Sequence, residues 1–235
     1  LAGNQGEATA QFGVDLTRPV GVVFAPERGA YLPTATPTLR VRYQDNQTLD
    51  LASLRILING EDRTSLFVKG AAEAEAALDA TSALPSGPND IVASIRDLGG
   101  NQGTGSTSFN VDVIPPTLSI GQPVQGSRHG TSEVEVILQY QDDQRLDLSS
   151  LEVNLDGSAV TLGQGPEGAM GRVGPLADGS HTVAARIRDQ AGNTSPLASA
   201  AFSVDTTVPD IQVLQPPPGF LVAAATPLVL VAYSD

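Results

Sequence analysis

The chain has 235 residues, of which 13 are Lys or Arg and 26 are Asp or Glu, giving a formal net charge of −13. Such an acidic balance argues against a nucleic-acid partner, because phosphate binding needs clustered cations. The chain contains no Cys, which excludes disulfides, thiolate catalysis and thiolate zinc sites. No apolar stretch approaches the roughly 20 residues of a membrane-spanning helix, so we expect no membrane insertion of this segment.

Short segments with alternating apolar and polar residues follow one another along the chain, and this alternation is the period of β-strands. In chain order they cover 38–43, 54–59, 91–96, 109–111, 136–140, 183–187 and 202–204. Clusters of Gly, Pro and Asn that favour turns separate them, for example at 85–89 and 99–103. Residues 71–80 contain strong helix formers, but the equivalent segment 167–171 has two glycines, so we predict a strand or loop for both.

The pattern is repeated along the chain. The motif Phe-x-Val-Asp begins at Phe12, Phe109 and Phe202, and a Tyr-x-Asp motif follows each copy at the same distance. Such agreement predicts tandem copies of one domain. We expect complete repeats at 16–112 and 113–205, the C-terminal strand of a preceding repeat at 1–15, and the N-terminal strands of a following repeat at 206–235. Neighbouring repeats of the same or an adjacent chain are the expected partners of these partial repeats.

About seven short strands per repeat, separated by frequent turns, are typical of an immunoglobulin-like β-sandwich. Each repeat closes with Asp-x-x-Gly-Asn, then Phe-x-Val-Asp and a Thr/Ile-x-Pro linker. This closing motif resembles the bacterial Ig-like (Big-type) tandem repeats of large secreted and cell-surface proteins. The resemblance implies an all-β chain of tandem immunoglobulin-like sandwiches with a partial repeat at each end, in an extracellular bacterial setting.

Acidic and amide side chains in the loops are the one chemical pattern that recurs between the repeats. In a sandwich of this topology the B–C and F–G loops lie at the pole where the first strand enters, so their oxygens can converge there. Oxygen ligands without Cys or His suit Ca²⁺, which takes 6–8 of them. We therefore hypothesise Ca²⁺ sites that stiffen the repeat junctions. The candidate ligands are Asp15, Asp45, Asp50, Asp97, Asn101, Asp112, Asp142, Asp147, Asp189, Asn193 and Asp205.

The same residues have a second interpretation that needs no cofactor. Asp and Asn side chains accept hydrogen bonds from nearby backbone N–H groups and tolerate left-handed backbone, so they form turns. Asp-x-x-Gly-Asn is then a hairpin turn, and Asp50 and Asp147 cap their own loops. Without a cation we expect Arg18, Arg96 or Arg188 to offset part of the negative charge. Both interpretations stay open on the sequence alone.

Catalysis is not predicted. The two histidines are His129, in a Gly-rich loop, and His181, which begins a strand where the first repeat has Asn89. We expect both to be ordinary solvated side chains. Neither has a repeated partner motif, and the chain has no nucleophile elbow and no phosphate-binding loop. The sequence therefore predicts no enzyme and no catalytic residue.

The predicted function is that of a non-catalytic structural spacer or stalk in a longer extracellular multi-repeat protein, such as an adhesin or a surface appendage. Prolines in the linkers restrict the backbone between repeats. The alternative is a carbohydrate- or protein-binding accessory module of a secreted enzyme, with an external ligand that the sequence does not identify. Exposed Tyr31, Phe67 and Phe220 gathered on one face would favour this alternative.

Overall fold

The computed structural model describes Gly3 and residues 5–235, and it is nearly all-β, with 52% strand and 1% helix. Its strands build immunoglobulin-like β-sandwiches, which confirms the predicted fold class. The chain divides into two compact units: unit 1 comprises residues 1–114 and 190–193, and unit 2 comprises residues 115–189 and 194–235. Each unit is described by itself below. Within the described residues, no helix combines the length and hydrophobicity needed to cross a membrane.

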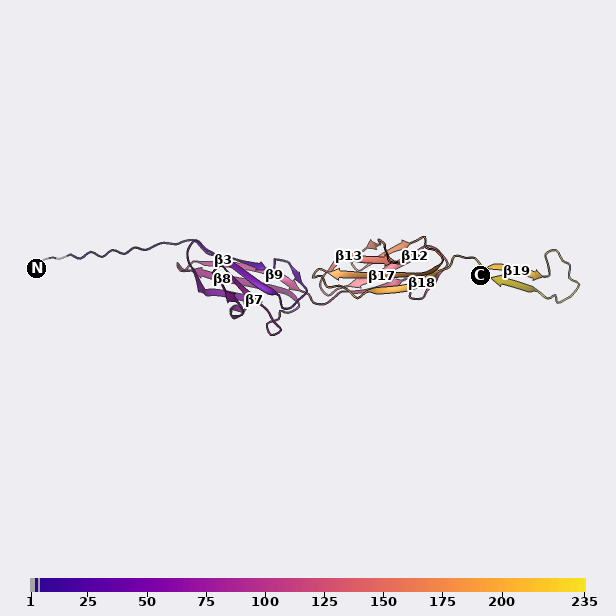
Figure 1. Ribbon diagram of the computed structural model, residues 1–235, viewed down its shortest axis with the longest axis horizontal. Helices are drawn as coiled ribbons and strands as arrows, with labels where there is room; N and C mark the ends of the chain where they lie inside the picture. The colour runs from indigo at the N-terminus through magenta and orange to yellow at the C-terminus, as the bar shows by residue number, and fades with distance from the viewer. Residues whose placement is uncertain (1–2, 4) are drawn as a thin grey trace. The chain divides into compact units, whose positions relative to one another are not determined.

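Unit 1 packs a four-stranded sheet against a five-stranded sheet (Figure 1). The first has the order β1 (Val20–Ala25), β3 (Thr38–Gln44), β7 (Glu73–Ala77), β6 (Val68–Lys69). The second has the order β2 (Tyr31–Leu32), β9 (Gln102–Val111), β8 (Gly87–Asp97), β4 (Leu49–Ile58), β5 (Glu61–Asp62). All pairings are antiparallel except that of β2 with β9. A single turn of 3₁₀ helix (Thr64–Leu66) follows β5.

The alternation of side chains explains why these segments form strands. On β3, Leu39, Val41 and Tyr43 point into the core, and the residues between them are exposed. The exposed Arg40 forms an ion pair across the sheet with Glu75 of β7 (2.9 Å). Part of the segment 71–80 forms strand β7, although it is rich in helix formers, and alternate alanines of this strand face the core. This agrees with the prediction of a strand or loop for the segment. Tertiary packing therefore overrides local helix propensity.

Unit 2 repeats this arrangement. One sheet has the order β10 (Thr117–Gln122), β12 (Val134–Gln141), β16 (Gly168–Val173), β15 (Gly163–Gln164). The other has the order β11 (Arg128–His129), β18 (Ala198–Val204), β17 (Gly179–Asp189), β13 (Leu146–Leu155), β14 (Ser158–Ala159). Its core holds Val136, Leu138 and Tyr140 at the positions that Leu39, Val41 and Tyr43 occupy in unit 1.

The two ends of the chain differ from the complete sandwiches. Residues 5–15 carry no strand, and Leu1, Ala2 and Asn4 lie outside the described residues. The hairpin of β19 (Asp210–Gln215) and β20 (Leu230–Ser234) leaves its apolar side chains exposed, for example Tyr233, at 84%. Its pairing reproduces that of β1 with β3 and of β10 with β12. The assignment of both ends to partial repeats stays a prediction.

Close approach of two strands requires glycine in unit 1. A Cβ atom added at Gly103 would collide with the backbone carbonyl of Pro19, and one added at Gly105 with that of Gly21. The start of β9 therefore lies so close to β1 and the residue before it that Gly103 and Gly105 leave no room for a side chain. This contact brings the chain segment before β1, which includes Asp15, next to the turn between β8 and β9.

Candidate cation site

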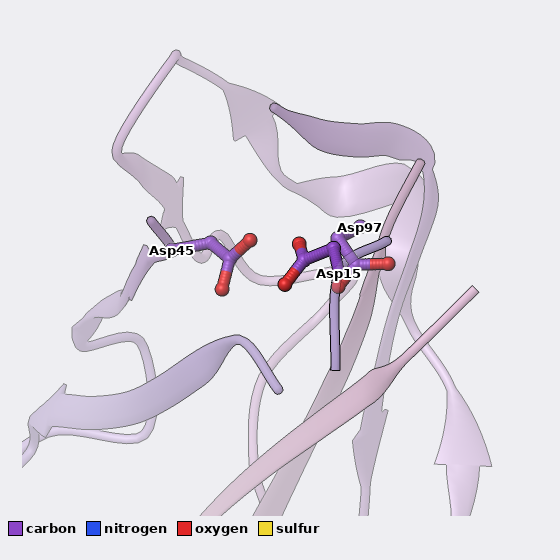
Figure 2. Close-up of side chains that lie close together, drawn as sticks. All are labelled: Asp15, Asp45 and Asp97. Atoms are coloured by element: carbon purple, nitrogen blue, oxygen red, sulfur yellow. The ribbon is translucent and has the colours of Figure 1, made fainter. Parts of the chain in front are cut away.

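Three carboxylates meet at one end of unit 1. Asp15 precedes β1, Asp45 begins the loop between β3 and β4, and Asp97 ends β8. One carboxylate oxygen from each lies within 4.8 Å of the other two. Figure 2 shows the side chain of Asp45 directed toward those of Asp15 and Asp97. Three segments that are distant in the sequence therefore place negative oxygens around one point.

Asp97 is the most rigidly held member of this group. This residue is only 2% exposed. Its carboxylate oxygens accept hydrogen bonds from the backbone and side-chain nitrogens of Asn101, each at 2.8 Å. Burial by itself raises the pKa of Asp97, but the hydrogen bonds from Asn101 and from the N–H groups of Gly100 and Gly99 hold that pKa below its ordinary 3.8. Asp97 is therefore charged at neutral pH.

Asn101 connects the turn to the segment before β1. Its side-chain nitrogen donates to Asp97 and also to the backbone carbonyl of Asp15 (3.0 Å). The amide acts here as a hydrogen-bond donor, so its nitrogen side faces the carboxylates. Asn101 therefore holds Asp15 and Asp97 in position through its nitrogen, and its side-chain oxygen does not face the point where a cation would bind.

Asp15 and Asp45 each divide their two oxygens between different environments. One oxygen accepts a turn hydrogen bond from the N–H two residues ahead: Thr17 for Asp15 (3.0 Å) and Gln47 for Asp45 (3.1 Å). The other oxygen, Oδ2 of Asp15 and Oδ1 of Asp45, is buried and has no hydrogen-bond partner. A buried anionic oxygen without a partner is costly, so it calls for a cation or a proton. The turn-capping and cation interpretations thus apply to different oxygens of the same side chain.

Positive side chains do not neutralise the group. The ion pairs of unit 1 in the described residues join Arg40, Arg42, Arg55 and Arg63 to glutamates and to Asp62. Arg96 donates to the side chain of Gln102 (3.2 Å). Within the described part of the chain, no ion pair joins Arg18, Arg96 or Arg188 to Asp15, Asp45 or Asp97, contrary to the expectation for a cation-free cluster.

Asp50 was a candidate ligand but lies apart from the three carboxylates. It sits on β4, where Oδ1 accepts the N–H of Ala52 (3.0 Å). Asp147 does the same in unit 2 and accepts the N–H of Ser149 (3.1 Å). For these two residues the structure supports the capping interpretation.

The other linker aspartates repeat the turn of Asp15. Asp112, which is fully buried, accepts the N–H of Ile114 (3.2 Å), and the exposed Asp205 accepts that of Thr207 (3.2 Å). In unit 2, Asp142 caps its loop through Oδ2, while its Oδ1 is buried without a hydrogen-bond partner, as in Asp45. Asp189 is buried at the end of β17, and Asn193 lies in the turn that follows.

The histidines correct one expectation. His181 is not a solvated side chain: it is 12% exposed and contacts the carboxylate of Asp156 (2.7 Å). His129 is half-buried and bonded to the hydroxyl of Ser127 (2.9 Å). The signal that sequence reasoning missed is a paired exchange between the repeats, since Asn59 and Asn89 of unit 1 are replaced by Asp156 and His181.

Each unit thus has the two packed sheets of an immunoglobulin-like β-sandwich. No family model and no curated protein matches its sequence. It is similar to the fibronectin(III)-like modules of CbhA from Clostridium thermocellum, with 13% identity and a TM-score of 0.45 over 79% of this chain and 94% of that one. It is also similar to the immunoglobulin domains 1–4 of Sidekick-1, with 11% identity and a TM-score of 0.46 over 80% of this chain and 50% of that one. A third similar structure comes from a 1.5-MDa bacterial ice-binding adhesin, with 13% identity and a TM-score of 0.42 over 86% of this chain and 71% of that one.

Proposed function

We propose that this chain is a non-catalytic structural spacer of an extracellular bacterial protein, and that Ca²⁺ held by Asp15, Asp45 and Asp97 fixes the segment that enters unit 1. The observation that carries the proposal is the pair of buried, unpartnered oxygens on Asp15 and Asp45, which belong to the same group as the carboxylate of Asp97. Two oxygens bound to one Ca²⁺ at 2.3–2.6 Å lie at most about 5 Å apart. Asp15, Asp45 and Asp97 each have a carboxylate oxygen within 4.8 Å of the other two, which satisfies this condition.

A cation at this position has a mechanical consequence. Asp15 stands outside the strands, four residues before Pro19. Asp45 directly follows β3 of one sheet, and Asp97 ends β8 of the other. One ion shared by the three therefore ties the segment before β1 to both sheets. This segment has few other attachments, namely the hydrogen bond from Asn101 to the Asp15 carbonyl and the packing of Pro19, which is buried. Ca²⁺ would convert this segment into part of the folded unit.

The alternative, a carbohydrate- or protein-binding module, depended on three exposed aromatic side chains. Phe67 is only 6% exposed and belongs to the core of unit 1. Tyr31 is half-buried on β2, and Phe220 is exposed in the segment between β19 and β20. A binding platform built from Phe67 and Tyr31 is therefore not available in unit 1, which favours the spacer.

Calcium titration of the full chain tests the proposal. We expect Ca²⁺ to raise the melting temperature above that in EDTA, whereas equal Mg²⁺ has a much smaller effect. Binding to the folded state alone contributes about 2.7 kcal/mol at a concentration of 100 Kd. The variant Asp45→Asn should lose one Ca²⁺ equivalent in isothermal titration, whereas the control Asp50→Asn, which changes a carboxylate of the same loop region, should not.

Hydrogen exchange locates the effect. Ca²⁺ should slow exchange of the backbone around Thr17, whose N–H is bonded to Asp15, and Asp45→Asn should remove this protection. If Ca²⁺ changes neither the melt nor the exchange, Asp15 and Asp45 act only as turn caps, and the cation part of the proposal fails.

A further inference from the structure

The second feature of interest is the environment of His181 in unit 2. The imidazole lies between two oxygen atoms: Nδ1 is 2.7 Å from Oδ2 of Asp156, and Nε2 is 2.8 Å from the backbone carbonyl of Ala177. A carboxylate and a carbonyl are acceptors only, and a neutral imidazole carries a single N–H. Both contacts are hydrogen bonds at the same time only when His181 carries two protons. The geometry therefore selects the imidazolium.

In unit 1 the equivalent connection between the two turns is made without a titratable side chain. Asn89 is 3% exposed at the equivalent position; its amide nitrogen donates to the carbonyl of Pro85 (3.0 Å), and its oxygen accepts from Asn59 (2.8 Å). The turns are otherwise matched: Asn59 accepts the N–H of Asp90, as Asp156 accepts that of Thr182. The two repeats therefore differ at this point in charge and in the direction of the side-chain hydrogen bond.

We propose that Asp156 and His181 form a pH-sensitive latch, which strengthens unit 2 in mildly acidic surroundings and weakens it when the imidazolium loses a proton. Asn59 and Asn89 make the equivalent connection in unit 1 independent of pH. Deprotonation leaves one ring nitrogen with its lone pair facing an oxygen, so the contact to Asp156 or to Ala177 becomes repulsive.

The titratable groups around His181 support this assignment. Asp156 comes from the turn between β13 and β14, and Asp178 from the loop that also contains Ala177. From β11, His129 packs edge-on against Phe202, whose ring also contacts His181; both ring pairs have centroids 5.6 Å apart. The hydrogen bonds to Asp156 and then to Ala177 raise the pKa of His181 above its ordinary 6.5, although burial opposes this. The hydrogen bond from His181, followed by that from Thr182, lowers the pKa of Asp156 below 3.8.

The latch also affects the segment of unit 2 that follows β18. Ala177 precedes Asp178, whose carboxylate accepts hydrogen bonds from the backbone and hydroxyl of Thr206 (2.9 and 2.8 Å) and from the hydroxyl of Thr207 (3.2 Å). The protonation state of His181 thus acts on the loop that fastens residues 206 and 207. We expect this attachment to loosen together with the latch.

The direction of the pH dependence follows from the two pKa shifts. A raised His pKa stabilises the fold fully below pH 6.5, and this contribution is lost as the pH rises through the folded-state pKa of His181. A lowered Asp pKa stabilises it above pH 3.8, and this contribution is lost as the pH falls through the folded-state pKa of Asp156. The latch is therefore complete between pH 3.8 and pH 6.5, and it opens as the pH rises through the folded-state pKa of His181.

NMR-monitored unfolding of the full chain in EDTA tests the latch independently of any cation. Both histidines of the chain lie in unit 2, so their ring protons report the unfolding of that unit alone. The wild-type unit 2 should melt about 4 °C lower at pH 9 than at pH 6. The double variant Asp156→Asn/His181→Asn installs the unit 1 pair and should lose this difference. Because that variant has no His181, its melt is followed through His129.

A direct titration complements the melts. The ring of His181 should titrate above pH 6.5 in the wild type and move down toward the ordinary value in Asp156→Asn. Below the transition, both ring nitrogens should carry protons in ¹⁵N spectra. A His181 that titrates at or below pH 6.5, or equal pH dependence of the melting temperature in the wild type and the double variant, overturns the proposal. Neither result affects the calcium proposal, which concerns unit 1.

Discussion

Units 1 and 2 share their core but close their ends with different chemistry. The last three inward residues of β3 and β12 correspond one to one, and the last of them is a buried tyrosine in each strand. The hairpin that completes the second sheet differs. In unit 1, pairing of β8 with β9 continues to Arg96 and Gln102, whereas in unit 2 the pairing of β17 with β18 ends at Ala185 and Ala198.

A buried serine replaces the missing pairs in unit 2. The hydroxyl of Ser195 accepts the N–H of Ile187 (3.0 Å), and its own N–H donates to the carbonyl of Ile187 (2.9 Å). Backbone groups of a strand end can thus be satisfied by a neighbouring strand or by one polar side chain. Core positions have no such choice, because only an apolar side chain of suitable volume fills the space between the sheets. This contrast explains why the repeats agree in their interior and diverge at their ends.

The largest effect should come from the shared tyrosine. Tyr140→Ala should reduce the free energy of unfolding of unit 2 by about 3–5 kcal/mol, because it empties a buried ring position. Tyr140→Phe keeps the ring and loses only the hydrogen bonds to the carbonyls of Gly165 and Gly168, so it should cost about 1 kcal/mol. Urea unfolding measures both. An unshifted transition for Tyr140→Ala would show that the ring does not contribute to the core.

An intermediate effect should distinguish the units. Gly105→Ala should destabilise unit 1 by about 1–3 kcal/mol or more, since the added Cβ collides with the backbone of Gly21. The control Ser106→Ala changes the next, exposed position of β9 and should be nearly neutral. At the equivalent position, which pairs with Ala185 as Gly105 pairs with Ala93, unit 2 has Ala198. Equal melting temperatures for Gly105→Ala and wild type would mean that β1 can move away from β9 at little cost.

The smallest effect concerns acid sensitivity. Asp79 lies in the loop between β7 and β8 and accepts hydrogen bonds from the hydroxyls of Thr81 and Ser82, then from their N–H groups, which lower its pKa to about 2. Stability from this carboxylate is present above pH 3.8 and is lost as the pH falls toward 2. Asp79→Asn should flatten the decline of unit 1 stability in this range, and the exposed Asp90→Asn should leave it unchanged. Acid titrations followed by circular dichroism would contradict this prediction if the two variants behave alike.

Much of the fold was predictable because strand periodicity and turn residues are local signals. Two aligned repeats also corrected a misleading local signal, since the glycines at 168 and 171 excluded the helix that residues 71–80 favour on their own. The close contact of β1 with β9 was not predictable, because nothing in the run of glycines at 99–105 distinguishes a turn from a strand crossing.

The candidate site was predictable in part. The recurring aspartates included Asp15, Asp45 and Asp97, which meet in the structure, but also Asp50, which lies on β4 and accepts the N–H of Ala52. The division of each carboxylate into one turn-capping oxygen and one buried, unpartnered oxygen depends on side-chain rotamers and on segments brought together by folding. His181 was misjudged because its neighbours Phe202 and Asp156 come from other strands and turns, distant in the sequence.

The sequence by itself determined the β-sandwich class and the inward faces of its main strands, because these follow from alternation and spacing along one chain. Only the tertiary structure decided which polar groups meet: three carboxylates at one end of unit 1, and a histidine between two acceptors in unit 2. The physical reason is range. Apolar periodicity is visible within a few consecutive residues. The partners of a buried charge can come from strands and turns that are distant in the sequence, and their geometry exists only in the folded sandwich.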